Sequence, residues 1–311
     1  MGPSPHTDPG PYRRLVERHL PFLRGYRCRP IDPGWGCFVL DINNEWIARF
    51  PRTADDARAV EVEERLLAEL ETRLPVPVPH YEHTVRDSRG RLRLVAYPKI
   101  RGRPLPTRNL WGPEAERWAS GLVEMLHALD RFPRTLGRRL GIAGSDGRDR
   151  KGPWTALYPI VRARVHPLLP ERIRALDSEY WERFLREESS LRALPVLTHG
   201  DLFPHHVLVD DHGLAGVLDW ESAGYADPVG DVTGLPDADG FQARVSLGYL
   251  GDDPSIGARL AFHRHAVPVH SLRRGLDTRD PKMVRSALHS YIRTLPRSNH
   301  AKQRPGSKPA R

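Results

Sequence analysis

The sequence predicts an α+β fold in which a small sheet with one helix is followed by a larger, mostly helical part. The first hundred residues combine short apolar runs with one long amphipathic segment, and the remainder carries longer helical patterns. One β-rich island, at residues 195–219, interrupts those helices. The 311 residues, of which 39% are hydrophobic and 28% charged, are enough to bury a core and exclude a wholly disordered chain.

The N-terminal third is predicted to contain two strands, then a helix, then a third strand. Residues 34–50 are predicted to form two short strands joined by a turn at Asn43-Asn44. Residues 55–74 are predicted to be a helix, because leucines recur at helical spacing opposite a glutamate-rich face and prolines follow directly. Residues 92–100 are predicted to form a further strand.

The rest of the chain is predicted to be helical around the β-rich island. Residues 113–130 begin with a proline, which suits the first turn of a helix, and residues 171–193 form a weaker helix candidate. Residues 133–154, which are rich in Gly, Arg and Asp, are predicted to be a long loop. A β island within a helical region is typical of a place where loops present reactive groups.

The ends and the composition limit the cellular setting. Residues 1–11 are predicted to be a flexible arm and residues 296–311 a disordered basic tail. The sequence has no apolar run of the roughly 18–20 residues that a membrane span needs, and no apolar leader. Because Cys28 and Cys37 are the two cysteines, we expect a reduced, cytoplasmic protein with no membrane partner.

The net charge of +9 leaves several partner classes open. A sequence pI near 9.9 suits a nucleic-acid-binding protein, and it equally suits a pocket for phosphates or for an acidic substrate. A solvated basic surface without a dedicated partner explains the same number.

The β-rich island carries two carboxylates at a spacing that suits phosphoryl transfer. Asp201 follows His199-Gly200 in a tight loop, and Asp219 ends a strand eighteen residues later, after a hairpin that folds the chain back. One such carboxylate can accept a hydroxyl proton while the other holds a divalent cation. In protein kinases, a metal-binding Asn follows the catalytic Asp by five residues, and His206 has that place here.

This segment resembles the aminoglycoside and macrolide phosphotransferases, which are antibiotic kinases. The matching residues are His199-Gly200-Asp201-Leu202, His206-Val207-Leu208, Gly216-Val217-Leu218-Asp219-Trp220 and Asp227-Pro228 with Asp231. The resemblance implies a bilobal protein-kinase-like fold, with a nucleotide-binding lobe at residues 12–98 and a catalytic and acceptor-binding lobe at 99–295. It also implies that Asp201 is the catalytic base, that Asp219 binds Mg²⁺ and that Asp231 braces the catalytic loop.

The same resemblance assigns nucleotide-binding roles in the N-terminal third. Arg49 has the place of the cation that binds the phosphates, and Glu63 the place of its partner on the following helix. Gly34 and Gly36 belong to the loop over the phosphates. Ala96-Tyr97-Pro98 matches the hinge whose backbone binds the nucleobase.

Two residues depart from the most common pattern of the family. Arg49 replaces the usual Lys and His206 the usual Asn, and the macrolide phosphotransferases share both changes. The aminoglycoside 2″-phosphotransferases share the His. Because these branches favour or accept GTP, the phosphoryl donor is expected to be GTP or ATP. Mg²⁺ prefers oxygen ligands, so His206 either binds the metal or contacts a phosphate or the water of the metal.

The expected acceptor is a small-molecule antibiotic, and the activity would give resistance or self-resistance. The stretch from Asp219 to Asp227 is too short for the activation segment of a protein kinase. Residues 101–198 hold 18 Lys and Arg against 12 Asp and Glu, and residues 232–311 hold 14 against 6. This balance favours a macrolide or a nucleoside-type antibiotic over a polycationic aminoglycoside.

Two other functions remain open at this level. A kinase of a primary metabolite such as choline, homoserine or a sugar has the same fold and would act on one common metabolite. A non-catalytic nucleotide- or nucleic-acid-binding protein would bind DNA or RNA in a salt-dependent way without needing Asp201. The presence of both Asp201 and Asp219 favours an enzyme without a nucleic-acid partner, and the oligomeric state is left open.

Overall fold

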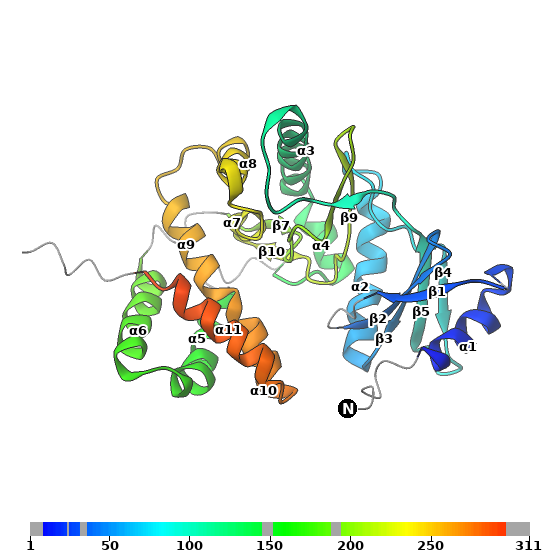
Figure 1. The fold of residues 1–311 in the computed structure, drawn as a ribbon, viewed down its shortest axis with the longest axis horizontal. Helices are drawn as coiled ribbons and strands as arrows, with labels where there is room; N and C mark the ends of the chain where they lie inside the picture. The colour runs from blue at the N-terminus through cyan, green and yellow to red at the C-terminus, as the bar shows by residue number, and fades with distance from the viewer. Residues whose placement is uncertain (1–8, 24, 32–35, 145–151, 188–193, 297–311) are drawn as a thin grey trace, which may run out of the picture. The chain divides into compact units, whose positions relative to one another are not determined.

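A computed structural model describes residues 9–23, 25–31, 36–144, 152–187 and 194–296. The chain divides into two compact units (Figure 1). The first unit consists of Met1–Asp146 and Val196–Gly251, and the second, here called the helical unit, of Gly147–Pro195 and Asp252–Arg311. The predicted lobe boundary at residue 98 falls inside the first unit, at the end of a strand. No helix among the described residues is long and apolar enough to cross a membrane.

The first unit is built on an antiparallel five-stranded sheet with the strand order β1-β2-β3-β5-β4. The strands are β1 (Cys28–Ile31), β2 (Cys37–Ile42), β3 (Trp46–Pro51), β4 (His83–Arg86) and β5 (Leu92–Pro98). The hairpin predicted around Asn43-Asn44 is confirmed, since both asparagines have positive φ, as a tight hairpin turn requires. The strand predicted at residues 92–100 is β5.

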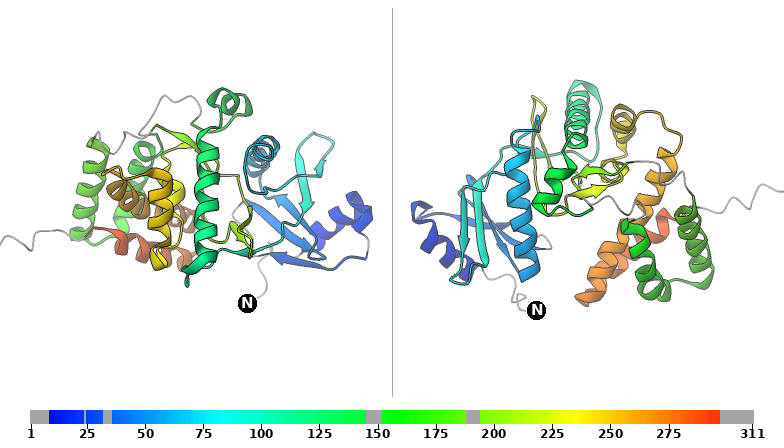
Figure 2. Two further views of the ribbon diagram at one scale, coloured as in Figure 1. Left: turned by 90° about the horizontal axis from the view of Figure 1, so that it is seen from above. Right: turned by 180° about the vertical axis from the view of Figure 1, so that it is seen from behind.

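One helix lies on each face of this sheet (Figure 2). Side chains of α1 (Gly10–His19) pack with Phe38, Phe50 and other residues on one face, where α1 includes the last two residues of the predicted arm. The helix α2 (Ala54–Leu70) packs on the other face, against β3 and β5. Because successive residues of a strand point to opposite faces, Arg49 lies on the α2 face between Ala48 and Phe50.

The helix α2 begins at a capping box and buries one charged residue. The Thr53 hydroxyl accepts from the Asp56 amide, and the Asp56 carboxylate accepts from the Thr53 amide. The helix ends at Leu70, four residues earlier than predicted, and a turn continues towards the prolines. Glu63 occurs on its buried face among Val60, Leu66 and Leu67, although it is a glutamate.

The remaining part of the first unit surrounds the β-rich island. The strands β7 (Val196–Thr198) and β10 (Gly224–Ala226) form one small sheet, and β6 (Arg103–Pro104), β8 (Val207–Val209) and β9 (Leu214–Val217) form another. The helices around them are α3 (Gly112–Asp130), α4 (Arg134–Leu140), α7 (Val229–Thr233) and α8 (Phe241–Leu250). The predicted helix at 113–130 is confirmed, as is the hairpin predicted between Asp201 and Asp219, which β8 and β9 form.

The prediction of a continuous loop at residues 133–154 is wrong. The helix α4 occupies Arg134–Leu140, and Gly141 ends it in the left-handed conformation. Seven residues give too few turns for a clear apolar period, so the arginines dominate the pattern. In addition, α5 already begins at Gly152.

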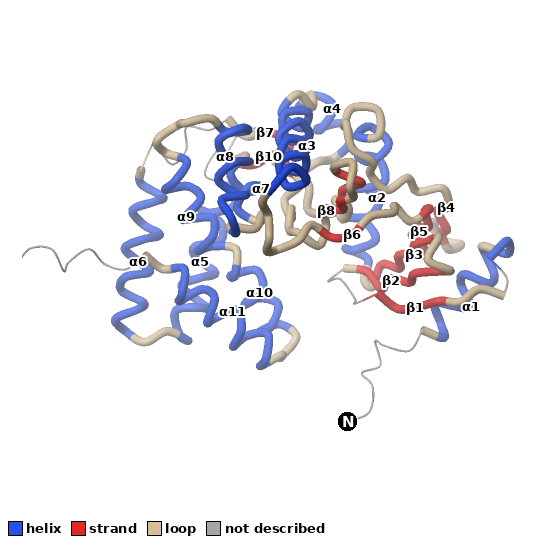
Figure 3. Tube along the Cα trace, turned by 45° about the horizontal axis from the view of Figure 1, so that its top comes forward, coloured by secondary structure: helices blue, strands red, loops and turns tan. Residues whose placement is uncertain are grey.

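The helical unit shows only helices and loops in its described part (Figure 3). Its helices are α5 (Gly152–Ile160), the π-helix η2 (Val161–Val165), the 3₁₀-helix η3 (His166–Leu168), α6 (Glu171–Arg186), α9 (Ile256–Ala266), α10 (Pro268–Asp277) and α11 (Pro281–Thr294). The helix predicted at 171–193 is α6, which ends at Arg186, and residues 188–193 lie outside the described residues.

A buried carboxylate connects four elements of the helical unit. Asp177, on α6, is fully buried and accepts hydrogen bonds from His166 Nε2 at 2.8 Å, His265 Nε2 at 2.7 Å and the Tyr291 hydroxyl at 2.9 Å. The Tyr291 hydroxyl accepts in turn from Trp181 Nε1 at 2.9 Å. Because a buried carboxylate without partners is costly, these bonds fix the relative positions of η3, α6, α9 and α11.

We expect Asp177→Ala to lower the free energy of unfolding by about 3–5 kcal/mol, because it leaves buried donors of two histidines and a tyrosine without an acceptor. Urea unfolding at neutral pH measures the effect. Glu179→Ala on the exposed side of the same helix is the control and should change the value by less than about 0.5 kcal/mol. Equal effects of the two substitutions would contradict this role of Asp177.

Candidate active site

The loop after β7 presents Asp201 and depends on a glycine. Gly200 has a φ of +80°, and a Cβ at this position would lie 2.2 Å from the Ser222 carbonyl oxygen. Any other residue would therefore have to push the Ser222 segment away, in addition to adopting a left-handed conformation. Gly200 thus brings the backbone of the Asp201 loop into contact with the segment that follows Asp219.

Two buried side chains, those of Asp231 and His199, fix this loop through hydrogen bonds. The Asp231 carboxylate, on α7, accepts from the backbone amides of His199 at 2.7 Å and Gly200 at 2.9 Å. His199 Nε2 donates to the Leu218 carbonyl at 2.9 Å, and its Nδ1 accepts from the Asp201 amide at 3.2 Å. These bonds require a neutral imidazole, and burial lowers the pKa of His199 to about 4. Burial raises the pKa of Asp231 to about 6, against the effect of the two amides.

Asp201, His206 and Asp219 converge on one point. Each offers a possible ligand atom, and these atoms all lie within 4.8 Å of one another. His206 Nδ1 hydrogen-bonds to the Asp201 carbonyl oxygen at 2.8 Å, so Nε2 is the nitrogen that faces Asp219 Oδ2, at 3.4 Å. Asp219 has a φ of +66°, and a left-handed conformation in a residue other than glycine is common at functional sites.

The Asp201 carboxylate is accessible, since 41% of its side chain is exposed. Burial of the rest and the charge of Asp219 raise its pKa, whereas His206 lowers it. The raised pKa makes this carboxylate a stronger base than an ordinary aspartate.

Arg49, on the strand β3, extends its guanidinium to the Asp219 carboxylate. Its Nη1 donates to both oxygens of Glu63, at 2.9 and 2.8 Å, and to the Tyr81 hydroxyl at 2.8 Å. Its Nη2 donates to Asp219 Oδ1 at 3.3 Å and to Glu221 Oε2 at 3.2 Å. The nitrogen Nη1 is therefore anchored between β3 and α2, while Nη2 faces the carboxylate of Asp219, which follows β9.

Glu63 also connects directly to the segment that carries Asp219. Its Oε1 accepts from the backbone amide of Trp220 at 3.0 Å. Arg49 is 6% exposed and Glu63 1% exposed, so the pair lies in the interior. The arrangement brings together four of the residues predicted from the sequence, namely Arg49, Glu63, His206 and Asp219, with Asp201 beside His206.

The residues predicted for the phosphate loop and for the hinge lie apart from Asp201, His206 and Asp219 in the sequence, and the structure describes most of them. Gly34 lies outside the described residues. Gly36 lies close to the charged cluster, since a Cβ there would be 3.1 and 3.2 Å from the Glu221 carboxylate oxygens. Ala96, Tyr97 and Pro98 form the end of β5, opposite Ala48, Ile47 and Trp46 of β3. Ala96 and Tyr97 are buried, and the Tyr97 ring lies 5.5 Å from the Tyr81 ring.

Sequence reasoning missed Glu221 and Tyr81. Glu221 follows Asp219 by two residues, so its place in the motif was the available signal. Burial and the charge of Asp219 raise its pKa to about 7. Tyr81 gave no signal in the sequence, because it belongs to no motif and reaches Arg49 only in the folded chain.

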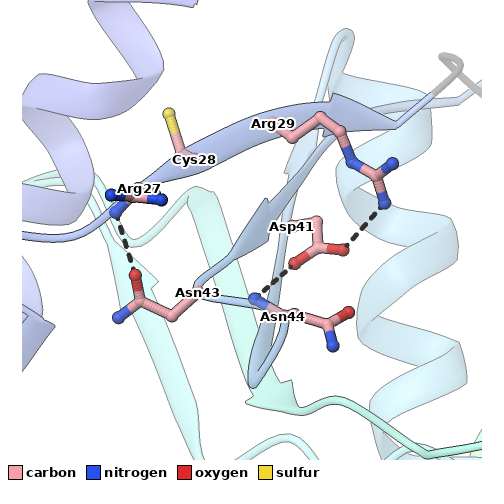
Figure 4. Close-up of a pocket in the computed structure, with 6 residues that line it drawn as sticks. All are labelled: Arg27, Cys28, Arg29, Asp41, Asn43 and Asn44. Atoms are coloured by element: carbon pink, nitrogen blue, oxygen red, sulfur yellow. Dashed lines mark hydrogen bonds and ion pairs between the residues drawn. The ribbon is translucent and has the colours of Figure 1, made fainter.

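A separate hollow of about 500 Å³ opens at the β1–β2 edge of the sheet (Figure 4). It is lined by Arg27, Cys28, Arg29, Asp41, Asn43 and Asn44. Asp41 pairs there with Arg29 at 3.3 Å and with Lys99 at 2.7 Å. None of the predicted site residues lines this hollow, so it is separate from the Asp201 cluster.

Comparisons with known proteins identify the family. The model of the phosphotransferase enzyme family matches residues 28–263, and the chain therefore belongs to this family. YcbJ, an uncharacterized protein of Bacillus subtilis (strain 168), is 26% identical over 275 residues, which are 80% of this chain and 83% of the relative. The resemblance inferred from the sequence is thus confirmed, and with it the enzyme class, a phosphotransferase.

Solved structures confirm the kinase-like α+β fold. The GDP and kanamycin complex of the aminoglycoside phosphotransferase APH(2″)-IIIa has a TM-score of 0.84 at 23% identity and covers 91% of this chain and 97% of the other. The macrolide 2′-phosphotransferase MphH from Brachybacterium faecium, as apoenzyme, has a TM-score of 0.66 at 24% identity, with coverages of 94% and 98%.

The lowered pKa of His199 predicts a pH-dependent contribution to stability. The folded chain keeps this imidazole neutral down to about pH 4, whereas the unfolded chain binds a proton near pH 6.5. The unfolded state therefore binds more protons between these values, and stability is lost as pH falls through this window.

We expect the stability difference between wild type and His199→Gln to shrink by about 3 kcal/mol from pH 7 to pH 4, because glutamine does not titrate. Urea unfolding of both proteins at several pH values gives this difference. The opposing titration of Asp231 occurs in both proteins and cancels. A difference that does not change with pH would contradict a neutral, buried His199.

Proposed function

We propose that this protein is a Mg²⁺-dependent O-phosphotransferase that moves the γ-phosphoryl group of GTP or ATP to a hydroxyl group of a small-molecule antibiotic. The observation that carries the proposal is the convergence of Asp201, His206 and Asp219, with one limb of Arg49 beside Asp219. Phosphoryl transfer requires mainly the positioning of groups and the neutralisation of charge, and this cluster supplies both.

In this proposal, Asp201 is the catalytic base. Its carboxylate is exposed enough to meet an acceptor hydroxyl, and its raised pKa favours acceptance of the hydroxyl proton as the phosphoryl group moves in line. The loop that carries Asp201 is fixed by Asp231 and His199, so the carboxylate keeps its orientation during the reaction.

Asp219 and His206 would hold Mg²⁺. The donor set fits a divalent cation, because His206 Nε2 and Asp219 Oδ2 face each other at 3.4 Å and Glu221 adds negative charge nearby. Nucleotide oxygens and water would complete the oxygen-rich coordination that Mg²⁺ prefers. When bound, the metal neutralises charge on the phosphate oxygens.

The nucleotide would lie along the sheet side of the cluster. Arg49 Nη2 is the nitrogen that can contact the phosphates. Gly36, where a Cβ would crowd the Glu221 carboxylate, would belong to the loop over them. Ala96, Tyr97 and Pro98, at the end of β5, would bind the nucleobase through their backbone. Structures with this fold were solved with GDP, and another as a streptomycin and ATP complex, which supports testing both GTP and ATP.

The acceptor is proposed to be an antibiotic that is not polycationic. The excess of Lys and Arg over Asp and Glu in residues 101–198 and 232–311 favours a macrolide or a nucleoside-type antibiotic. The kanamycin complex named above makes aminoglycosides the necessary comparison. The biological effect in this proposal is resistance or self-resistance.

The proposal is tested by mass spectrometry of reactions that contain the protein, Mg²⁺, GTP or ATP, and one acceptor each. The panel comprises macrolides, nucleoside antibiotics and aminoglycosides, followed by choline, homoserine and sugars. We expect one phosphoryl group to be added to a macrolide or nucleoside antibiotic. Phosphorylation of a common metabolite alone would replace the proposed acceptor, and no product in the whole panel would contradict the proposed activity.

On the acceptor found in this panel, Asp201→Ala should lower the rate by about 10²–10⁴-fold, because it removes the general base. Asp211→Asn in the exposed β8–β9 turn is the control and should keep the rate of wild type. Near-full turnover of Asp201→Ala would contradict the role of Asp201.

A further inference from the structure

The two terminal nitrogens of the Arg49 guanidinium, Nη1 and Nη2, have different partners. Among the described residues, Nη1 donates to Glu63, on α2, and to Tyr81, just before β4, whereas Nη2 donates to Asp219 and Glu221. The two terminal nitrogens of a guanidinium lie in a fixed plane, so anchoring one of them sets the direction of the other. The anchor of Nη1 therefore determines where Nη2 points.

We propose that Tyr81 is a positioning residue for nucleotide binding, whose hydroxyl holds Nη1 of Arg49 against Glu63 so that Nη2 is directed at the phosphates. This inference rests on the proposed function, since it assigns to Nη2 the task of contacting the nucleotide. Among the described contacts, Tyr81 hydrogen-bonds to none of Asp201, His206 and Asp219, and we assign it no contact with the nucleotide. It acts through Arg49.

Tyr81 lies beside the pair of Arg49 and Glu63. Its oxygen accepts from Arg49 Nη1 at 2.8 Å, and the charge of Glu63 acts on its hydroxyl. Burial and the nearby Glu63 charge raise the pKa of Tyr81 well above its usual value, so the hydroxyl keeps its proton. A protonated phenol can donate to the carboxylate and accept from the guanidinium at the same time.

The packing around Tyr81 keeps its ring in place. The ring lies against the cluster of Cys37, Ala57, Val60, Leu92 and Val95, between α2 and the sheet. The Tyr97 ring lies 5.5 Å away at an interplanar angle of 33°. Because the ring is held by secondary-structure elements, the hydroxyl can act as a fixed anchor.

This arrangement also explains why position 49 needs an arginine here. A lysine has one terminal nitrogen, which would either bind Glu63 and Tyr81 or reach Asp219 and Glu221. The task assigned to Tyr81 exists only when Arg49 supplies a second limb. The two residues should therefore be coupled, and this coupling distinguishes a positioning role from a purely structural one.

The test is a double-mutant cycle on nucleotide binding. Isothermal titration calorimetry with GDP and with ATP, both with MgCl₂, gives the Kd for wild type, Tyr81→Phe, Arg49→Lys and the double variant. Phenylalanine keeps the ring and removes only the hydroxyl. Tyr26→Phe is the matched control, since its hydroxyl donates to the Arg13 carbonyl at 3.2 Å, away from the cluster. Binding is measured at a temperature at which melting curves show all five proteins folded.

We expect Tyr81→Phe to raise the Kd about 10-fold when Arg49 is present and less than about 2-fold in the Arg49→Lys background. Tyr26→Phe should leave the Kd unchanged. An equal effect of Tyr81→Phe in both backgrounds, or no effect with Arg49 present, would overturn the inference alone. If wild type binds neither nucleotide, the proposed function falls and this inference falls with it.

Discussion

The buried ion pair between Arg49 and Glu63 is the interaction on which the candidate site depends. Glu63 receives both a guanidinium limb from β3 and the Trp220 amide from the segment behind Asp219. A buried charge is costly unless all its hydrogen bonds are made, so these three groups must stay together. The sheet, α2 and the Asp219 segment are thereby fixed relative to one another, and the backbone around Asp219 is held in its left-handed conformation.

The cluster carries more negative than positive charge. Glu63, Asp219 and Glu221 surround Arg49, and the carboxylate of Asp201 lies beyond His206. Burial and then the charge of Asp219 raise the pKa of Glu221 to about 7. An excess of negative charge favours a cation at this cluster, and the Mg²⁺ proposed at Asp219 and His206 would supply it.

The sequence was most informative where the relevant contacts are local. Asp201, His206 and Asp219 lie within one loop and hairpin, so the hairpin between the two aspartates and the kinase-like place of His206 indicated that they would meet. Arg49 and Glu63 were assigned through the resemblance to the antibiotic phosphotransferases, from their places on the matching strand and helix. The contact of Tyr81 was not predicted, because Tyr81 meets Arg49 across 32 positions of sequence, where no periodicity applies. The helix α4 was not predicted, because seven residues are too few to show a helical repeat of apolar side chains. The roles of these side chains in binding and catalysis remain predictions.

The most direct test of this account is nucleotide binding by Glu63→Gln. Glutamine keeps the shape of the side chain but removes the charge that holds Arg49. Glu69→Gln makes the same change on the same helix, at a residue that pairs at the surface with Arg73 of the following turn. Calorimetry with GDP and MgCl₂, on proteins shown to be folded by circular dichroism, should give at least about 10-fold weaker binding for Glu63→Gln and wild-type binding for Glu69→Gln. Wild-type affinity in a folded Glu63→Gln protein would contradict the account, because the phosphate-binding cation would then not depend on its buried partner.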